Sequence, residues 1–303
     1  MRTEFVVGTR QSKLAMRQTD LVVAALKSKF PKTTFTIEKI TTEGDRNRQD
    51  SLRKIGGKGV FVKEIEQRLT DGRIDFAVHS LKDVMPVLPE NLTIGGVPKR
   101  DSPFDCLITT KPLQSLGQLP AGAKIGTSSS RRQGQFLHLR PDVEIVSIRG
   151  NVDSRLRQLR ELNLDGIILA EAGLNRLGVD LSELYQLSLK GVLLPAAGQG
   201  AIGIECRVND YETRHLLNAI EDPATRQQVT IERDFLRRLG GSCNFPIGAF
   251  ASQVPGGIRF DGLVASIDGQ KLFRKADTSQ GGKNLGKHIA DELIGEGALT
   301  LIQ

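Results

Sequence analysis

The chain has 303 residues, 39% of them hydrophobic and 25% charged, which is enough for two or three globular domains. Its net charge of +7 favours an anionic partner such as nucleic acid, an acidic membrane surface, or a carboxylate or phosphate ligand. Only 5% of the residues are aromatic and no run of basic or apolar residues stands out, so we expect neither a nucleic-acid nor a membrane partner.

The first part of the chain alternates the patterns of strands and helices. Ser12 is a candidate N-cap for a helix whose apolar face includes Leu14 and Leu26. We predict strands over 4–8, 34–40 and 76–80, and a second helix over 60–69. This rhythm predicts a mainly parallel sheet with helices on its faces. The polar, glycine-containing segment 41–59 is long for a connection, and we interpret it as a lid.

A second α/β unit begins near residue 99. We predict its strands over 106–110, 123–126, 143–148 and 166–170, and its helices over 129–139 and 152–162. A glycine-rich turn and an apolar strand follow at 193–207, and this strand is a candidate to rejoin the first sheet.

The last part predicts a small antiparallel α+β domain. A helix over 225–239 precedes three strand patterns that are separated by "PGG" and "DG" turns, and a helix over 283–294 closes the chain. The predicted fold class is therefore α/β, with two α/β domains and a small α+β domain at the C-terminus.

Four polar clusters follow predicted strands, where α/β proteins bind ligands. They are "GTRQS" (8–12), "HSLKD" (79–83), "GTSSSRR" (126–132) and "RGN" (149–151). Hydroxyl groups and backbone N–H groups at a helix start bind anions, and guanidinium groups pair with carboxylates or phosphates. The candidate arginines are Arg10, Arg131, Arg132, Arg149, Arg155 and Arg176. The alternative is that the hydroxyls cap helices and the arginines form surface ion pairs.

Other candidate groups have two interpretations. Asp83 follows a strand beside Lys82, where it could stabilise a cation in a substrate or simply pair with the lysine. His79 lies within the strand and is more typical of a packed side chain than of a catalytic one. The "GGKG" sequence at 56–59 lacks the spacing of a nucleotide-binding P-loop and is interpreted as a loop.

The three cysteines are widely spaced and odd in number, which predicts free thiols in a reducing compartment. Cys106 and Cys206 lie in apolar strands, whereas Cys243 lies in a loop where a thiol can act as a nucleophile or an attachment point. The N-terminus lacks the apolar core of a secretion signal, so we expect a cytoplasmic protein. No cysteine or histidine spacing predicts a metal site.

Taken together, eight segments resemble the porphobilinogen deaminase (hydroxymethylbilane synthase) family, in the order typical of that family. They are "GTRQSKLA", "GGKGVFVKEIE", "DFAVHSLKDV", "GTSSSRRQ", "IRGNVDSRL", "AGLNRLG", "PAAGQGAIGIECR" and "GGSCNFPIG". The resemblance implies a transferase of haem and tetrapyrrole biosynthesis. Such enzymes join four porphobilinogen molecules head to tail, release ammonia, and yield linear hydroxymethylbilane.

The resemblance also implies three domains, two of them like periplasmic binding proteins. The corresponding division is 1–99 with 200–217, then 100–199, then 218–303. It further implies a dipyrromethane cofactor held through a thioether to Cys243, a small-molecule substrate, and a monomer.

Site residues follow from the same resemblance. Asp83 corresponds to the catalytic aspartate, which would stabilise the cation left when the substrate loses its amino group. The implied cofactor-binding residues are Cys243, Lys82, Asp83, Ser80, Thr127, Ser128, Ser129, Arg131 and Arg132. The implied substrate-binding residues are Arg10, Ser12, Arg149, Arg155, Arg176 and Gln199.

Two other classes of function remain open: a non-catalytic binder of an anionic solute, and a basic nucleic-acid-binding protein. The mass of the intact protein separates them from the enzyme, because only the enzyme carries two additional pyrrole rings.

Overall fold

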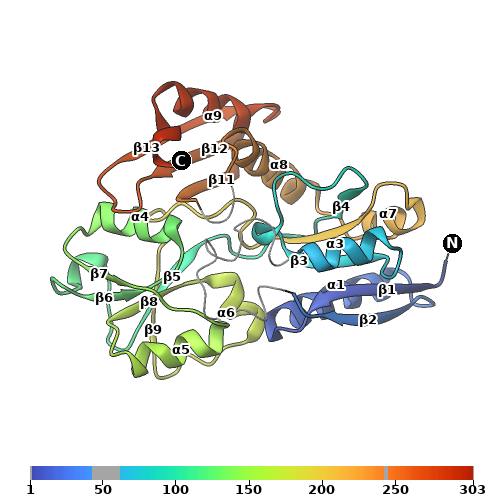
Figure 1. Ribbon diagram of the computed structural model, residues 1–303, viewed down its shortest axis with the longest axis horizontal. Helices are drawn as coiled ribbons and strands as arrows, with labels where there is room; N and C mark the ends of the chain where they lie inside the picture. The colour runs from blue at the N-terminus through green and yellow to red at the C-terminus, as the bar shows by residue number, and fades with distance from the viewer. Residues whose placement is uncertain (1, 43–61, 242–244, 303) are drawn as a thin grey trace. The chain divides into compact units, whose positions relative to one another are not determined.

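A computed structural model describes residues 2–42, 62–241 and 245–302. The chain forms two compact units. Unit 1 comprises Met1–Asp101 and Gly200–Val229, and unit 2 comprises Ser102–Gln199 and Thr230–Gln303. Each unit is built around a five-stranded sheet, and unit 2 also contains a three-stranded sheet (Figure 1). The predicted lid at 41–59 lies almost wholly outside the described residues.

The sheet of unit 1 has the strand order β2-β1-β3-β10-β4. Its strands are β1 (Glu4–Arg10), β2 (Thr34–Ile40), β3 (Phe76–Ser80), β4 (Leu92–Gly96) and β10 (Ile202–Arg207). The helical segments of this unit are α1 (Lys13–Lys29), α3 (Lys63–Thr70), the short 3-10 helix η1 (Leu81–Asp83) and α7 (Tyr211–Asn218).

Side-chain alternation divides the core of unit 1 between two faces of the sheet. Phe5 and Val7 of β1 share a core with α1 and α7, whereas Val6 packs against a core that contains Ile65 and Leu69 of α3. This period of two is typical of a strand, whereas the sequence predicted β1 from a short apolar run that ends at a glycine. As predicted, Ser12 caps α1, and its hydroxyl accepts a hydrogen bond from the Ala15 amide at 3.2 Å.

The main sheet of unit 2 has the order β7-β6-β8-β5-β9. Its strands are β5 (Asp105–Thr109), β6 (Lys124–Gly126), β7 (Glu144–Val146), β8 (Gly166–Ala170) and β9 (Tyr185–Ser188). The helical segments are η2 (Leu116–Gln118), α4 (Ser130–Leu139), α5 (Val152–Glu161) and α6 (Glu171–Leu177). Phe136 of α4 packs in the core on one face, and Leu159 of α5 and Leu174 of α6 pack in the core on the other.

The sheet of unit 1, predicted to be mainly parallel, contains one strand that runs against the other four, and so does the main sheet of unit 2. In unit 1, β1 pairs in parallel with β2 and β3, but β10 is antiparallel to both β3 and β4. In unit 2, β6 pairs in parallel with β7 and β8, but β5 is antiparallel to both β8 and β9. Each sheet thus contains one reversed strand, and it is the strand by which the chain enters that unit from the other one.

The strand within 193–207 was a candidate to rejoin the first sheet, and β10 does so. The C-terminal part comprises α8 (Pro223–Arg238), β11 (Ile247–Val254), β12 (Gly257–Ala265), β13 (Leu272–Ser279), α9 (Leu285–Gly295) and η3 (Ala298–Leu301). Its sheet is antiparallel in the order β11-β12-β13, as predicted. Since this sheet lies in the same compact unit as β5 to β9, the division of residues 218–303 into a third domain stays a prediction.

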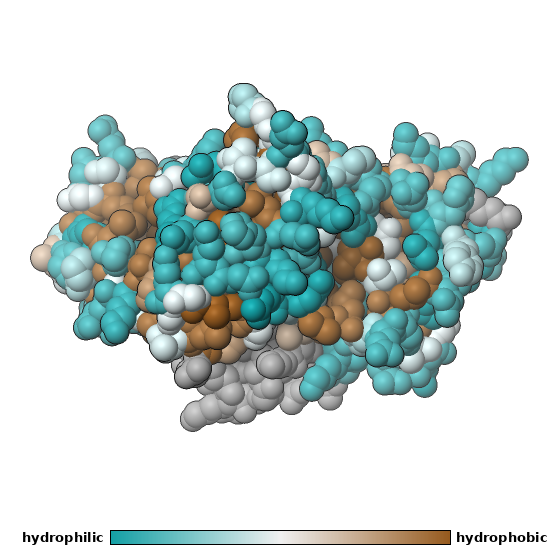
Figure 2. Space-filling view, turned by 90° about the horizontal axis from the view of Figure 1, so that it is seen from above, coloured by the Kyte–Doolittle hydropathy of each residue, from teal (hydrophilic) through white to brown (hydrophobic). Residues whose placement is uncertain are grey.

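Among the described helices, none is both long and apolar enough to cross a membrane. Hydrophilic side chains cover much of the surface drawn in Figure 2, in keeping with the charged composition.

Candidate active site

A pocket in unit 1 gathers several of the predicted site residues. Strands β1 and β3 are parallel, so their carboxyl ends, at Arg10 and Ser80, lie at the same edge of the sheet. The pocket at this edge is lined by Arg10, Ser12, Leu14, Ala15, Gln18, Val62, Val78, His79, Ser80 and Asp83. Four residues of the two predicted binding sets therefore line one pocket, and one of the four is Asp83, the candidate catalytic residue.

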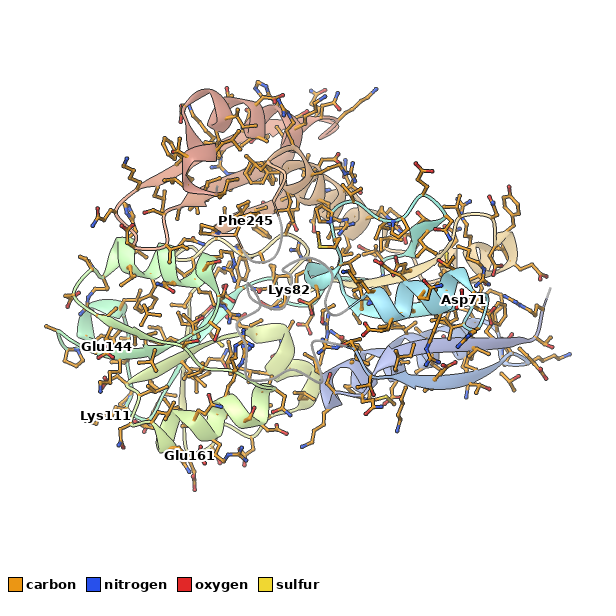
Figure 3. The ribbon with its side chains drawn as sticks, viewed as in Figure 1. Asp71, Lys82, Lys111, Glu144, Glu161 and Phe245 are labelled. Carbon is orange, nitrogen blue, oxygen red and sulfur yellow. The ribbon has the colours of Figure 1, made fainter. Side chains whose placement is uncertain are left out.

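The short helix η1 presents the "LKD" sequence directly after β3. Lys82 and Asp83 are both half-buried, and Figure 3 shows Lys82 at the end of this sheet. The amide of Leu81 donates a hydrogen bond to the carbonyl of Ala201 at 3.0 Å, so the position of η1 is tied to the glycine-rich turn before β10. Asp83 is thus held on a short, anchored segment rather than on a long loop.

Two polar residues that line the pocket, Gln18 and His79, were not assigned to the site from the sequence. Gln18, on α1, donates from Nε2 to the hydroxyl of Ser80 at 2.9 Å and is almost fully buried. His79 lines the pocket, and its Nε2 lies 3.0 Å from Oε2 of Glu205, which is on β10. Gln18 lies three residues after the segment "GTRQSKLA", and Glu205 lies within the segment "PAAGQGAIGIECR", but neither was assigned to the site from the sequence.

The second group of predicted residues lies in unit 2, after β6. The hydroxyl of Ser129 caps α4 by accepting from the Arg132 amide at 3.4 Å, and Thr127 accepts from the Ser129 amide at 3.2 Å. The hydroxyl of Ser128 is 3.1 Å from that of Ser147 and also donates to the carbonyl of Ile148. The capping interpretation therefore explains Ser129, and the loops after β6 and β7 are joined through Ser128.

Arg131 and Arg132 are buried around one carboxylate. Nη1 of Arg131 lies 2.7 Å from Asp105 Oδ2, and Nη2 of Arg132 lies 2.7 Å from Asp105 Oδ1. Burial raises the pKa of Asp105, but the charges of the two arginines and their hydrogen bonds outweigh it and hold that pKa well below its ordinary value. Two guanidinium groups and one carboxylate leave one net positive charge in this buried cluster.

Gln199, predicted to bind substrate, belongs to the same cluster. Its Nε2 donates to Asp105 Oδ1 at 3.0 Å and to the carbonyl of Pro103 at 2.7 Å. In this structure Gln199 therefore lies with the two predicted cofactor-binding arginines. No motif marked Asp105, since it lies at the start of an apolar strand, and sequence reasoning missed it.

The remaining predicted arginines are half-buried in unit 2. Arg149 follows β7, Arg155 lies in α5, and Arg176 lies in the last turn of α6. Arg149 and Arg155 flank the start of α5, where Asn151 caps the helix by accepting from the Ser154 amide at 2.9 Å. Arg176 lies at the C-terminal end of α6, so it is not placed at the start of a helix as Arg149 and Arg155 are.

The cysteines differ in chemistry. Cys106 and Cys206 are fully buried in β5 and β10, and burial raises the pKa of each thiol to about 12. Both are therefore inert thiols at neutral pH, as predicted. Cys243 lies outside the described residues, just before Phe245, which packs against the core of the C-terminal sheet (Figure 3). Within the described chain, no group of histidine, cysteine and acidic residues is arranged to hold a metal ion.

Comparison with known proteins adds independent evidence. Residues 5–215 match the family model described as "Porphobilinogen deaminase, dipyromethane cofactor binding domain", and residues 226–295 match "Porphobilinogen deaminase, C-terminal domain". Proteins named porphobilinogen deaminase from Limosilactobacillus reuteri (strain DSM 20016) and Brevibacillus brevis are 54% and 48% identical to the chain. These alignments cover 100% and 96% of this chain, and 99% and 94% of the two relatives.

Comparison with solved structures finds only distant similarity. The VFT2 domain of BvgS from Bordetella pertussis is 14% identical with a TM-score of 0.44, covering 72% of this chain and 87% of that domain. The methionine binding protein MetQ is 11% identical with a TM-score of 0.43, covering 74% of this chain and 93% of its own. Both scores are low, so the α/β fold class rests on the sheets of the protein itself.

Proposed function

Because the chain belongs to the porphobilinogen deaminase family along nearly its whole length, we propose that it joins four porphobilinogen molecules head to tail into hydroxymethylbilane. Each condensation releases ammonia, and the product is a precursor of tetrapyrroles such as haem. The observation that carries the proposal is the pocket of unit 1, where a carboxylate, a guanidinium group and two hydroxyl groups surround one space.

Asp83 is the proposed catalytic residue. When porphobilinogen loses its amino group, the remaining methylene-pyrrole carries a positive charge, and a fixed carboxylate stabilises that charge in a partly dehydrated pocket. Asp83 is half-buried and lies on a segment anchored to the turn before β10. Anchoring matters because a carboxylate that is already in position has little reorganisation to undergo during the reaction.

The dipyrromethane cofactor fits the donors of the protein. Each of its two pyrrole rings carries two carboxylate side chains, which require fixed cations and hydrogen-bond donors. The buried cluster of Arg131, Arg132 and Asp105 keeps one net positive charge, as such a ligand requires. When bound, the cofactor supplies a tethered pyrrole as the acceptor for the first condensation.

The residues proposed to hold the cofactor are Ser80, Lys82, Asp83, Thr127, Ser128, Ser129, Arg131 and Arg132, with Cys243 as the point of covalent attachment. Attachment through Cys243 is supported by the state of the other two cysteines, whose buried thiols have pKa values of about 12.

The residues proposed to hold the substrate are Arg10, Ser12, Arg149, Arg155, Arg176 and Gln199. Their guanidinium groups suit the acetate and propionate groups of porphobilinogen, because a guanidinium can bind a carboxylate through two hydrogen bonds. We also propose that the protein acts as a monomer in the cytoplasm, without nucleic acid or membrane as a partner.

Incubation with porphobilinogen tests the function directly. We expect ammonia and a linear bilane to appear in a ratio of four to one, as the head-to-tail stoichiometry requires. A protein that binds porphobilinogen but releases no ammonia would instead be a solute-binding protein, and the proposed function would be wrong.

A further inference from the structure

Beneath the pocket of unit 1, three titratable side chains come together on one face of the sheet. In the antiparallel pair of β3 and β10, Glu205 is directly opposite Ala77. Since His79 is two residues after Ala77, both His79 and Glu205 point to the face that α3 covers. Their side chains are 3% and 0% exposed, and the His79 Nε2 to Glu205 Oε2 distance is 3.0 Å.

Glu66 of α3 is the third member. It is half-buried, and its pKa is raised to about 7 by burial and by the charge of Glu205, with His79 and Lys63 acting in the opposite direction. Across the pocket, Arg10 from β1 and Asp83 from η1 are the other charged side chains. We call Glu66, His79 and Glu205 the buried acid–histidine cluster.

One oxygen of Glu205 is unsatisfied. Oε1 is buried and has no hydrogen-bond partner among the described residues, whereas Oε2 pairs with His79. A buried carboxylate with an unpaired oxygen is costly unless a proton or a cation compensates it. The second carboxylate, Glu66 on α3, is close enough for the charge of Glu205 to raise its pKa.

The cluster is connected to the reaction space through His79. The imidazole lines the same pocket as Asp83, while Glu205 behind it is completely buried. Among the three side chains of the cluster, His79 is the one that also lines the pocket.

We propose that the buried acid–histidine cluster stores a proton for the pocket that contains Asp83. This proposal rests on the proposed function. In each condensation the C–N bond to the protonated amino group of the substrate breaks, and ammonia leaves with the electron pair. A bond then forms between the methylene carbon and the α-carbon of another pyrrole. The C–H bond of that α-carbon breaks, and its electrons return to the ring. The proton passes to His79 and from there to the two carboxylates of the cluster. The cluster then gives the proton to ammonia, which departs as ammonium.

Two variants test the store by kinetics. His79→Gln removes the group that faces the pocket, and we expect kcat to fall by about 10²-fold with a much smaller change in KM. Glu66→Gln removes the carboxylate whose pKa is raised to about 7. Since the store must be free of its proton to accept another, wild-type kcat should fall as the pH drops through about 7, where the pKa of Glu66 lies. In Glu66→Gln this fall should move to lower pH by about one unit.

Matched controls make the same chemical changes at exposed positions of unit 1. They are His215→Gln on α7 and Glu90→Gln before β4, and both should match the wild type in kcat and in pH profile. If His79→Gln does not fold, as judged by its thermal melt, Glu66→Gln decides the matter, because Glu66 is only half-buried.

A second measurement does not depend on turnover. Carbon-13 NMR of the glutamate side chains in the intact holoprotein should show one carboxyl group that titrates near pH 7, absent in Glu66→Gln and present in Glu90→Gln. If no glutamate titrates above about pH 6, or if both cluster variants keep the wild-type pH profile, the store is wrong. If the wild type and both controls fail to consume porphobilinogen, the proposed function fails instead.

Discussion

In unit 2, Asp105 pairs with the two arginines that follow the loop at 126–129, although no sequence motif contains it. It accepts from Arg131, Arg132 and Gln199, and it is fully buried. A single carboxylate thereby orients two guanidinium groups that the sequence alone assigned to a ligand. The motif "SSSRR" identified the cations, but their geometry is set by a strand residue more than twenty positions earlier.

Asp105→Asn should destabilise the protein by about 3–5 kcal/mol, because two buried guanidinium groups lose their charge partner. The measurement is urea unfolding, with the exposed Asp277→Asn of unit 2 as the control. The pKa of Asp105 is lowered in the folded state, so its stabilisation is complete above its unfolded pKa of about 3.9 and is lost as the pH falls further. Loss of this acid dependence in Asp105→Asn is expected, and an unchanged acid dependence would contradict the role.

Asp83→Asn should lower kcat by about 10²-fold or more, because asparagine keeps the shape of the side chain but carries no negative charge. Binding of porphobilinogen should change much less, since the arginines are untouched. Ammonia release under saturating substrate gives kcat, and Asp20→Asn, which is exposed on α1, provides the control. Activity within twofold of the wild type would remove Asp83 from its catalytic role.

Helix α4 connects three parts of unit 2. Its first turn is capped by Ser129, its buried face carries Arg131 and Gln135, and Gln135 exchanges two hydrogen bonds with the backbone of Leu194 at 2.7 and 3.0 Å. Farther along, Nδ1 of His138 lies 2.9 Å from the carbonyl of Gly269, in the turn between β12 and β13. Helix α4, which follows the loop at 126–129, is thus also packed against the C-terminal sheet, and Figure 1 shows α4 next to that sheet.

Gly134→Ala tests this close packing. A β-carbon at this position would lie 2.5 Å from the backbone oxygen of Ser266, so the turn before β13 must move away from α4. We expect a loss of about 1–3 kcal/mol of unfolding free energy, although alanine normally favours a helix over glycine by about 1 kcal/mol.

Gly295→Ala in α9 is the matched control, because a β-carbon there meets no atom within 4 Å. It should be neutral or slightly stabilising in the same urea unfolding experiment. Equal effects of the two substitutions would show that the contact between α4 and the turn does not constrain the packing.

Across the whole molecule, the two five-stranded sheets follow the same plan. Each has three strands in parallel register, then one reversed strand, then an edge strand that is antiparallel to it. The reversed strands are β10 and β5, and the chain passes between the units just before each of them. In each sheet, the strand that runs against its neighbours is therefore the first one formed after the chain crosses from the other unit.

The cofactor assignment predicts a property of the intact protein. Its mass should exceed that of the bare chain by two pyrrole rings, and the excess should disappear in Cys243→Ala. Cys206→Ala should keep the excess, because the Cys206 thiol is buried with a pKa of about 12. Intact-protein mass spectrometry of the three proteins is sufficient, and an excess mass that survives Cys243→Ala would show that the cofactor is attached elsewhere.

Local patterns were enough to predict most elements of this protein. The alternation of "TFTIEKI" predicted β2 at its observed ends, Ser12 and Ser129 predicted the starts of α1 and α4, and the three C-terminal strands follow from their turns. Four of the described strands and α-helices, β4, β9, α6 and α7, were not predicted. They are short, between four and eight residues, so they hold too few turns or alternations for a periodic pattern to stand out.

By itself, the sequence determined most of the longer elements, the α/β class, the positive net charge and the family, because these depend on composition, on neighbouring residues and on short motifs. Tertiary structure alone decided the reversal of β5 and β10, the Asp105 cluster, and the approach of Glu66 and Glu205 to His79. Those features join residues that are far apart in the chain, and periodicity carries no information about which distant segments pair or which buried charges find each other.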